Sequence, residues 1–275
     1  MSIFSISPSF LIIGAQKAAT SSLYSYLIQH PNIVPPKQKE VNFFNIDENY
    51  NRGEAFYQSQ FNKYYNPFKK HVTFEATPEY LYLPHIPKRI FDYNKDLKLI
   101  VVFREPAARA YSAWNMFKKL HELEGVPSVI EKSYLEGIPN NLNPTLFGEK
   151  FPSFQKIIDL EKEYMSSDKG FLEPSFLRRG LYAEQVQCYL EYFDKEQLLF
   201  LEHREVSQHL VPTLNKILNF IGQNDYHWNN LNKTISNKGM YADKAPPVLK
   251  ELKKYYVPYN LKLYKLINRE FDWNN

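Results

Sequence analysis

A lysine and three hydroxyl residues gather near the start of this 275-residue chain, between an apolar run and an amphipathic segment. Residues 10–13 are apolar and predict a buried strand, while residues from Ser21 onward have the apolar spacing of a helix. Lys17 and Thr20 fall in the turn between them, where the first amides of a helix lack partners within it. Such amides, the helix dipole and an ammonium group together bind phosphate or sulfate. This stretch therefore predicts an anion-binding loop.

The loop differs from the P-loop of nucleotide triphosphatases, which has the pattern G-x-x-x-x-G-K-[ST]. Lys17 follows Gly14 by three residues, and the second glycine is absent. A triphosphatase would also place a magnesium-binding Asp after a later strand, where this chain has Arg104. An Arg fork at the carboxyl end of a parallel strand, with the hydroxyl of Ser112 in the following helix, suits a phosphate monoester. Arg109 is expected to form a structural ion pair.

Composition limits the partners and the compartment. The net charge of +4, from 34 basic and 30 acidic side chains, supports an anionic ligand only weakly, and no nucleic-acid partner is expected. Cys188 is the sole cysteine, so no intrachain disulfide is possible, and we expect a core thiol. No cluster of His, Cys or carboxylates predicts a metal site. Without a signal peptide or a long apolar run, we expect a cytoplasmic protein with no transmembrane segment.

Strand and helix patterns alternate along the chain, which predicts an α/β fold with a mostly parallel central sheet flanked by helices. Helices are expected over residues 183–193 and 206–221, and over 246–272 with an interruption at Pro258. The length of 275 residues allows one large domain or two small ones. The predicted strands lie near residues 10–13, 71–75, 97–103 and 197–202.

Taken together, these motifs resemble those of sulfotransferases that use 3′-phosphoadenylyl sulfate (PAPS), most closely the heparan-sulfate N- and 3-O-sulfotransferase branch. Residues 17–22, Lys-Ala-Ala-Thr-Ser-Ser, resemble the branch's Lys-Thr-Gly-Thr-Thr/Ser loop. Residues 104–112, Arg-x-Pro-x-x-Arg-Ala-x-Ser, resemble its site for the cofactor's 3′-phosphate. The likeness extends over residues 10–273. It implies the P-loop-NTPase-like sulfotransferase fold, with residues 1–275 forming a single domain.

The resemblance also implies roles for individual residues. Glu40, in Lys-Glu-Val-x-Phe-Phe, is implied to be the general base, and Lys17 to stabilise the leaving group. Asn42, Ala76 and Met240 depart from the family, which often has His, Lys and Arg there. The implied PAPS-binding residues are Lys17, Ala18, Ala19, Thr20, Ser21, Ser22, Arg104, Ser112, Lys238, Gly239, Met240 and Tyr241.

The predicted function is metal-independent, in-line transfer of a sulfuryl group from PAPS to a hydroxyl or amine of a small-molecule or glycan acceptor. The acceptor is expected to contact the loops around residues 37–45, 77–85 and 121–150. Two alternatives remain open: a nucleotide or small-molecule kinase with a degenerate P-loop, and a non-catalytic anion- or carbohydrate-binding module. Magnesium-dependent ATP binding would indicate the first, and glycan binding without transfer the second.

Overall fold

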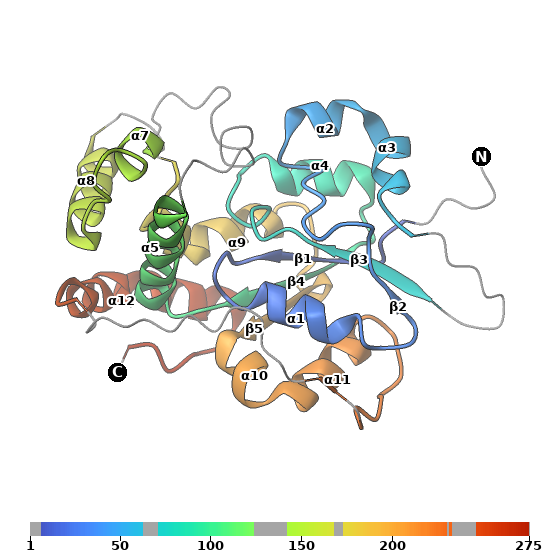
Figure 1. Cartoon of the computed structure of the whole chain (residues 1–275). Helices are drawn as coiled ribbons and strands as arrows, with labels where there is room; N and C mark the ends of the chain where they lie inside the picture. Colours follow the sequence, from blue (N-terminus) through green and yellow to red (C-terminus); the bar gives the residue numbers. More distant parts are fainter. Residues whose placement is uncertain are drawn as a thin grey trace. The chain divides into compact units, whose positions relative to one another are not determined.

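The apolar runs form strands of one parallel sheet, which confirms the predicted fold class (Figure 1). In the part of the chain that the computed structural model describes, the sheet has five strands in the order β2-β3-β1-β4-β5. The two-residue edge strand β2 was not predicted, because the prolines around it indicate a loop. The strands are β1 (Phe10–Gly14), β2 (Ile33–Val34), β3 (Val72–Ala76), β4 (Lys98–Phe103) and β5 (Leu198–Glu202).

The described residues are 7–62, 71–123, 142–167, 173–229, 231–232 and 246–274. They fall into two compact units. The first comprises Met1–Arg104 and Glu184–Lys238 and holds the whole sheet, and the second comprises Glu105–Ala183 and Gly239–Asn275. The single domain expected over residues 1–275 stays a prediction.

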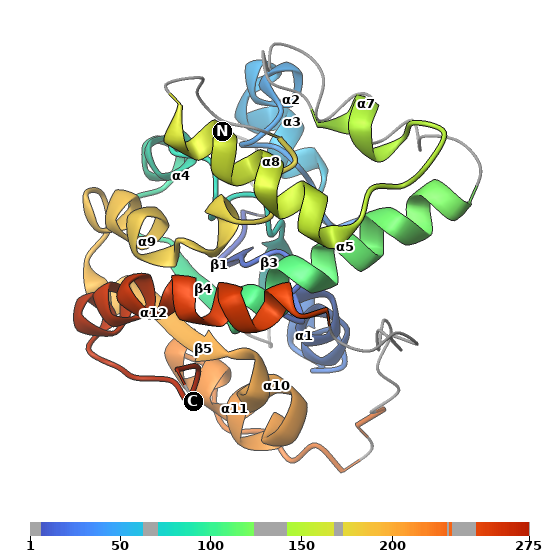
Figure 2. The same ribbon diagram turned by 90° about the vertical axis from the view of Figure 1, so that its left-hand side faces the viewer.

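Helices cover both faces of the sheet in the first unit. Helices α1 and α4 lie on opposite faces (Figures 1 and 2), as right-handed crossovers from β1 to β2 and from β3 to β4 require. The prediction of one continuous helix over 206–221 is wrong, because the helix is interrupted at His209. Pro212 falls in the first turn of the second helix, where proline is tolerated. The helices are α1 (Thr20–Leu27), α2 (Asp47–Asn51), α3 (Gly53–Ser59), α4 (Ile86–Tyr93), α9 (Tyr182–Leu190, which starts in the second unit), η2 (Lys195–Gln197), α10 (His203–Gln208) and α11 (Leu210–Phe220).

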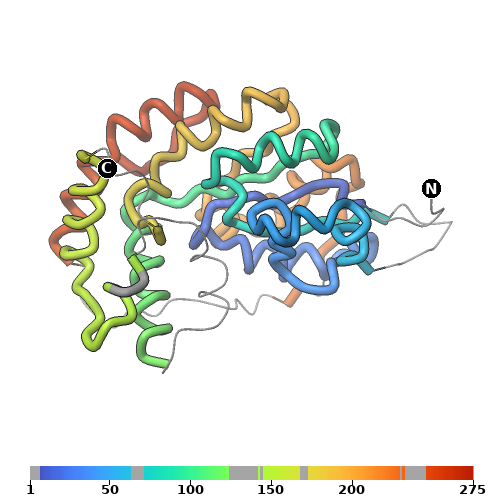
Figure 3. Tube along the Cα trace, turned by 90° about the horizontal axis from the view of Figure 1, so that it is seen from above, coloured from blue at the N-terminus to red at the C-terminus, as the bar shows by residue number. Residues whose placement is uncertain are grey.

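The described part of the second unit is helical. Helix α5 packs against α12 (Figures 2 and 3). Buried side chains such as Trp114, Leu252 and Tyr256 fill the core of this unit. The predicted interruption at Pro258 is wrong, because α12 continues through this residue. Proline removes one backbone hydrogen bond of the helix, and the packing of buried residues on either side outweighs that loss. The helices are α5 (Pro106–Glu122), α7 (Asn143–Leu146), α8 (Phe154–Ser166), η1 (Arg178–Gly180) and α12 (Val248–Ile267).

Gly14, at the end of β1, is required by close packing in the first unit. A Cβ on Gly14 would lie 2.5 Å from Leu81 Cβ. The Leu81 N–H donates to Ile13 O at 2.8 Å, so the two segments can move apart only by losing this hydrogen bond. We expect Gly14→Ala to lower the free energy of unfolding by about 1–3 kcal/mol. Gly53→Ala is a comparison in which a Cβ meets no atom within 4 Å, so that any loss of stability comes from the strained backbone with φ +78° alone. Urea denaturation showing Gly14→Ala as stable as the wild type would contradict the prediction.

Candidate active site

The turn between β1 and α1 has the geometry of an anion cradle. Helix α1 starts at Thr20, and its first internal hydrogen bond runs from Leu23 N to Ala19 O at 2.9 Å. The amides of Thr20, Ser21 and Ser22 therefore precede the hydrogen-bond ladder of the helix. No acidic residue lies in the first turn of α1. The positive end of the helix dipole is thus available to a negative ligand.

The same turn is conformationally strained. Lys17 has φ 67° and Ala19, the N-cap of α1, has φ 71°, a left-handed region that non-glycine residues seldom occupy. Strain of this kind persists where the surrounding structure imposes it, and it concentrates at functional sites.

Arg104 lies against this turn. It follows β4, the neighbour of β1 in the sheet, and its Nη1 donates to Lys17 O at 3.0 Å. The structure therefore brings together two of the predicted cofactor residues from positions 87 apart in the sequence. Their roles in binding stay predictions.

His203 is a neighbour of Arg104 that the sequence-based prediction missed. It begins α10 directly after β5, so it lies at the carboxyl edge of the sheet. Burial, and then the positive charges of Arg104 and Arg204, lower the pKa of His203 to about 4. The imidazole is therefore neutral at neutral pH, and an anion bound at Arg104 would favour its protonation. The signal available in the sequence was a histidine directly after a predicted strand.

Glu40 lies in a second strained segment of the first unit. It has φ 60°, and Asn42 has φ 53°. The Glu40 carboxylate forms an ion pair with Lys39, and 45% of its side chain remains exposed. Asn42 Nδ2 donates to Glu40 O at 2.8 Å, and Asn49 Nδ2 donates to Asn42 O at 3.0 Å. Side-chain amides thus stabilise the positive φ of Glu40 and Asn42. In this conformation the Glu40 carboxylate stays accessible.

A cavity of about 240 Å³ opens beside Glu40. Its lining combines carboxamides, apolar side chains and one aromatic ring, besides the carboxylate of Glu40. Hydroxyl-rich ligands with apolar ring faces suit such a lining. The lining residues are Gln38, Glu40, Val41, Asn42, Ile46, Asn49, Phe56 and Gln60.

The strain at Ala19 makes a testable prediction about the cradle. Ala19→Gly removes a Cβ from a left-handed residue, so we expect the free energy of unfolding to rise by up to about 1 kcal/mol. Ala18→Gly is the matched control: Ala18 is buried and is not a positive-φ residue, so losing its methyl group should destabilise the protein. Thermal unfolding of both variants checks this, and a lower Tm for Ala19→Gly would contradict it.

The other predicted residues are placed less completely. Ser112 is buried in α5 and belongs to the second unit, whereas Arg104 belongs to the first. Lys238, Gly239, Met240 and Tyr241 lie outside the described residues, as does most of the predicted loop over 121–150. Cys188 is half-buried in α9 rather than in the core, and burial raises the pKa of its thiol, which makes it a weak nucleophile.

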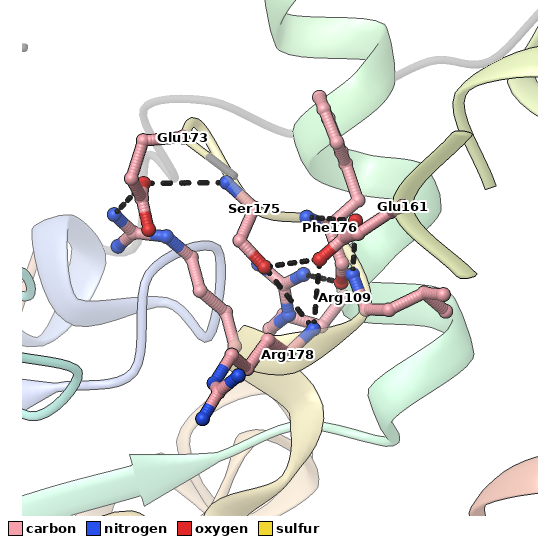
Figure 4. A network of polar contacts seen from close by, with 8 residues as sticks. Arg109, Glu161, Glu173, Ser175, Phe176 and Arg178 are labelled. Carbon is pink, nitrogen blue, oxygen red and sulfur yellow. Dashed lines mark hydrogen bonds and ion pairs between the residues drawn. The ribbon is translucent and has the colours of Figure 1, made fainter. Parts of the chain in front are cut away.

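A buried polar network in the second unit surrounds Arg109 (Figure 4). Arg109 is fully buried and donates to the Phe176 carbonyl, and burial lowers its pKa. Among the described residues it does not form the predicted ion pair, and the two carboxylates of the network bind other donors. Glu173 pairs with Arg179 at 3.0 Å, and Glu161 accepts from the Ser175 hydroxyl and from the amides of Phe176, Leu177 and Arg178. Arg109 is therefore a structural residue.

Two features of the described residues concern metal ions and membranes. These residues contain no group of three or more His, Cys, Asp or Glu side chains placed to hold a metal ion. None of their helices has both the length and the apolar composition needed to span a bilayer.

The parallel sheet and the anion cradle after β1 define a P-loop-like α/β protein. The chain belongs to the sulfotransferase family: residues 7–252 match the family described as "Sulfotransferase domain". The protein is therefore a sulfotransferase enzyme, as the sequence predicts.

Individual relatives agree with this assignment. The chain is 26% identical to "Membrane-associated sulfotransferase kil1" of Dictyostelium discoideum over 322 residues, covering 98% of this chain and 67% of that protein. It is 26% identical to human "Heparan sulfate glucosamine 3-O-sulfotransferase 5" over 289 residues, covering 97% and 74%. The crystal structure of a sulfotransferase from Alicyclobacillus acidocaldarius matches with a TM-score of 0.71 at 27% identity, covering 98% of this chain and 99% of that one. Heparan sulfate N- and 3-O-sulfotransferases are both among the relatives, which confirms the predicted resemblance.

Proposed function

We propose that this sulfotransferase moves a sulfuryl group from PAPS to a hydroxyl or amine of a glycan acceptor by in-line transfer. The observation that carries the proposal is the distribution of backbone strain. Of the five non-glycine residues with positive φ among those described, Lys17, Ala19, Glu40 and Asn42 fall in the two segments predicted to do chemistry, and the fifth, Asn268, caps a helix. Family membership supports PAPS as the donor, since sulfotransferases generally use it.

In the proposed reaction, Glu40 takes the proton of the acceptor while the acceptor oxygen or nitrogen forms a bond to sulfur. The bond between sulfur and the bridging phosphate oxygen breaks, and adenosine 3′,5′-bisphosphate (PAP) leaves with the electron pair. The Lys17 ammonium group and the first amides of α1 stabilise the charge on the leaving oxygen. Arg104 holds the 3′-phosphate. Positioning and electrostatics supply the catalysis.

A glycan acceptor is supported by two observations. The cavity beside Glu40 offers carboxamides for hydroxyl groups and Phe56 for the apolar face of a sugar ring. Relatives that cover nearly all of this chain carry names that specify heparan sulfate.

A transfer screen tests the proposal. The protein is incubated with PAPS and acceptors of several classes, glycans among them, in the presence of EDTA, and release of PAP is measured. The expected result is acceptor-dependent PAP release without added metal. Magnesium-dependent ATP binding without PAP binding would instead indicate a kinase, and glycan binding without PAP release would indicate a non-catalytic module.

A further inference from the structure

Glu75 is a carboxylate buried at the carboxyl end of β3, and the proposed reaction gives it no role. None of its side chain is exposed. Tyr57 Oη donates to Glu75 Oε1 at 2.5 Å, Thr77 Oγ1 donates to Oε2 at 2.8 Å, and Tyr80 Oη donates to Oε1 at 3.1 Å. Burying a carboxylate costs free energy, and groups buried in this way are often functional. The hydrogen-bond partners of Glu75 therefore indicate its role.

These partners lead directly to the segment that carries Glu40. The backbone N–H of Val41, the residue after Glu40, faces the Glu75 carboxylate and has a lowering effect on its pKa. The Tyr80 hydroxyl, which donates to Glu75, accepts from Phe43 N at 2.9 Å and Phe44 N at 3.3 Å. Residues 43 and 44 are thus tied to Glu75 through the Tyr80 hydroxyl.

The rings of Phe43 and Phe44 complete the anchor. Both side chains are buried, and Phe43 stacks on Tyr57 with ring centroids 4.4 Å apart. Tyr57 therefore contacts the segment through its ring and Glu75 through its hydroxyl. The backbone leaves this anchored stretch toward Glu40, which has to adopt φ 60°.

We propose that Glu75 is a positioning residue for the sulfuryl transfer: as a carboxylate it fixes residues 41–44, and so holds Glu40 in its strained conformation beside the acceptor cavity. This inference rests on the proposed function, in which Glu40 is the base. Glu75 itself touches no reacting atom.

The charge state of Glu75 matters, because all of its identified partners donate hydrogen bonds. A protonated carboxyl carries a hydrogen of its own, and the Tyr80 hydroxyl, which already accepts from two backbone amides, is poorly placed to accept it. Burial raises the pKa of Glu75 from 4.5 to about 7, against the lowering effect of its hydrogen bonds. The titratable groups that face it are the phenols of Tyr57 in α3, Tyr80 after β3 and Tyr93 in α4, whose own pKa values burial raises. Loss of the anchor is thus expected on the acid side of neutral pH.

The contribution of Glu75 to folding stability changes with pH in the opposite direction to its expected contribution to activity. Because the pKa of Glu75 is raised in the folded protein, the stabilising contribution is fully present below about pH 4.5 and is lost as the pH rises through about 7. Glu75 is thus ionised, at a cost in stability, over the same pH range in which the anchor forms. A group kept at such a cost points to function rather than to folding.

The test compares Glu75→Gln with the matched control Glu161→Gln. Glu161 is equally buried and accepts backbone hydrogen bonds, but it belongs to the polar network of the second unit. In Glu75→Gln the amide group replaces one acceptor oxygen, so we expect kcat to fall about 10- to 100-fold with PAP affinity unchanged. We expect kcat of the wild-type enzyme to rise with pH near 7, and this rise should disappear in Glu75→Gln and persist in Glu161→Gln.

Amide hydrogen exchange gives a readout that does not need activity. At pH 8 the protection of Val41, Phe43 and Phe44 should fall in Glu75→Gln but not in Glu161→Gln, and below pH 6 the wild type should lose the same protection. Tyr80→Phe should also lower kcat while keeping the rise near pH 7, because Glu75 remains.

Two results would overturn the inference: unchanged protection of residues 41–44 in a folded Glu75→Gln protein, or a wild-type pH profile retained by that variant. Failure of the proposed function looks different. In that case the wild type releases no PAP with any acceptor, while the exchange experiment still decides whether Glu75 anchors the segment.

Discussion

Replacing Glu40 by Gln is expected to lower turnover by at least about 100-fold while leaving the affinity for PAP nearly intact, since the amide cannot accept the acceptor's proton. The substitution preserves the shape of the side chain, and Glu40 is remote in sequence from the anion cradle at residues 17–22. Steady-state kinetics with the acceptor found in the screen gives kcat, and calorimetric titration gives the Kd for PAP. The pattern separates loss of a base from loss of a binding site.

Lys39 provides the comparison for this experiment, because its ammonium group forms the ion pair with Glu40. Lys39→Met removes the pair but keeps the base, so its effect on kcat should be much smaller than that of Glu40→Gln. Full turnover in Glu40→Gln on the true acceptor would show that another group takes the proton.

Lys17→Ala is expected to impair both chemistry and binding. Removing a charged donor aimed at the leaving oxygen should lower kcat by about 100- to 1,000-fold, the range found for loss of one oxyanion donor. The affinity for PAP should fall as well, because the same ammonium group faces the 5′-phosphate in the proposed complex. The same kinetic and calorimetric measurements apply.

The control for Lys17 is Lys88→Ala, which removes a lysine from the exposed surface of α4, where Lys88 pairs with Asp92. This variant should match the wild type in kcat and in Kd for PAP. Equal effects of Lys17→Ala and Lys88→Ala would mean that the cradle acts through net charge alone, contrary to the proposed mechanism.

The cradle and the Glu40 segment share a feature that sequence patterns do not reveal. Lys17 and Glu40 are residue types that disfavour positive φ, yet the folded chain imposes it on both. Propensity would have predicted glycine at such positions, and only Ala19 stands where the resembled pattern has one. The strain is imposed by surrounding contacts, such as Arg104 on Lys17 O and Asn42 on Glu40 O.

Much of the fold and of the candidate site was determined by the sequence alone. The apolar runs of β1, β3, β4 and β5 are local signals, and each strand was predicted within a residue or two. The family followed from motifs in a fixed order, and Lys17, Glu40 and Arg104 were named from those motifs.

Only the tertiary structure decided which side chains meet. That Arg104 lies on the carbonyl of Lys17, that His203 lies beside Arg104, and that Glu75 anchors the segment after Glu40 all depend on strand order and on contacts between distant residues. The tertiary structure also overrode two local signals, since α12 continues through Pro258 and Arg109 bonds to a carbonyl. The physical reason is that helix and strand patterns record local hydrogen bonding and hydrophobic periodicity. The charge state of Glu75 and the backbone of Glu40 are set by burial and by hydrogen-bond partners from distant parts of the chain.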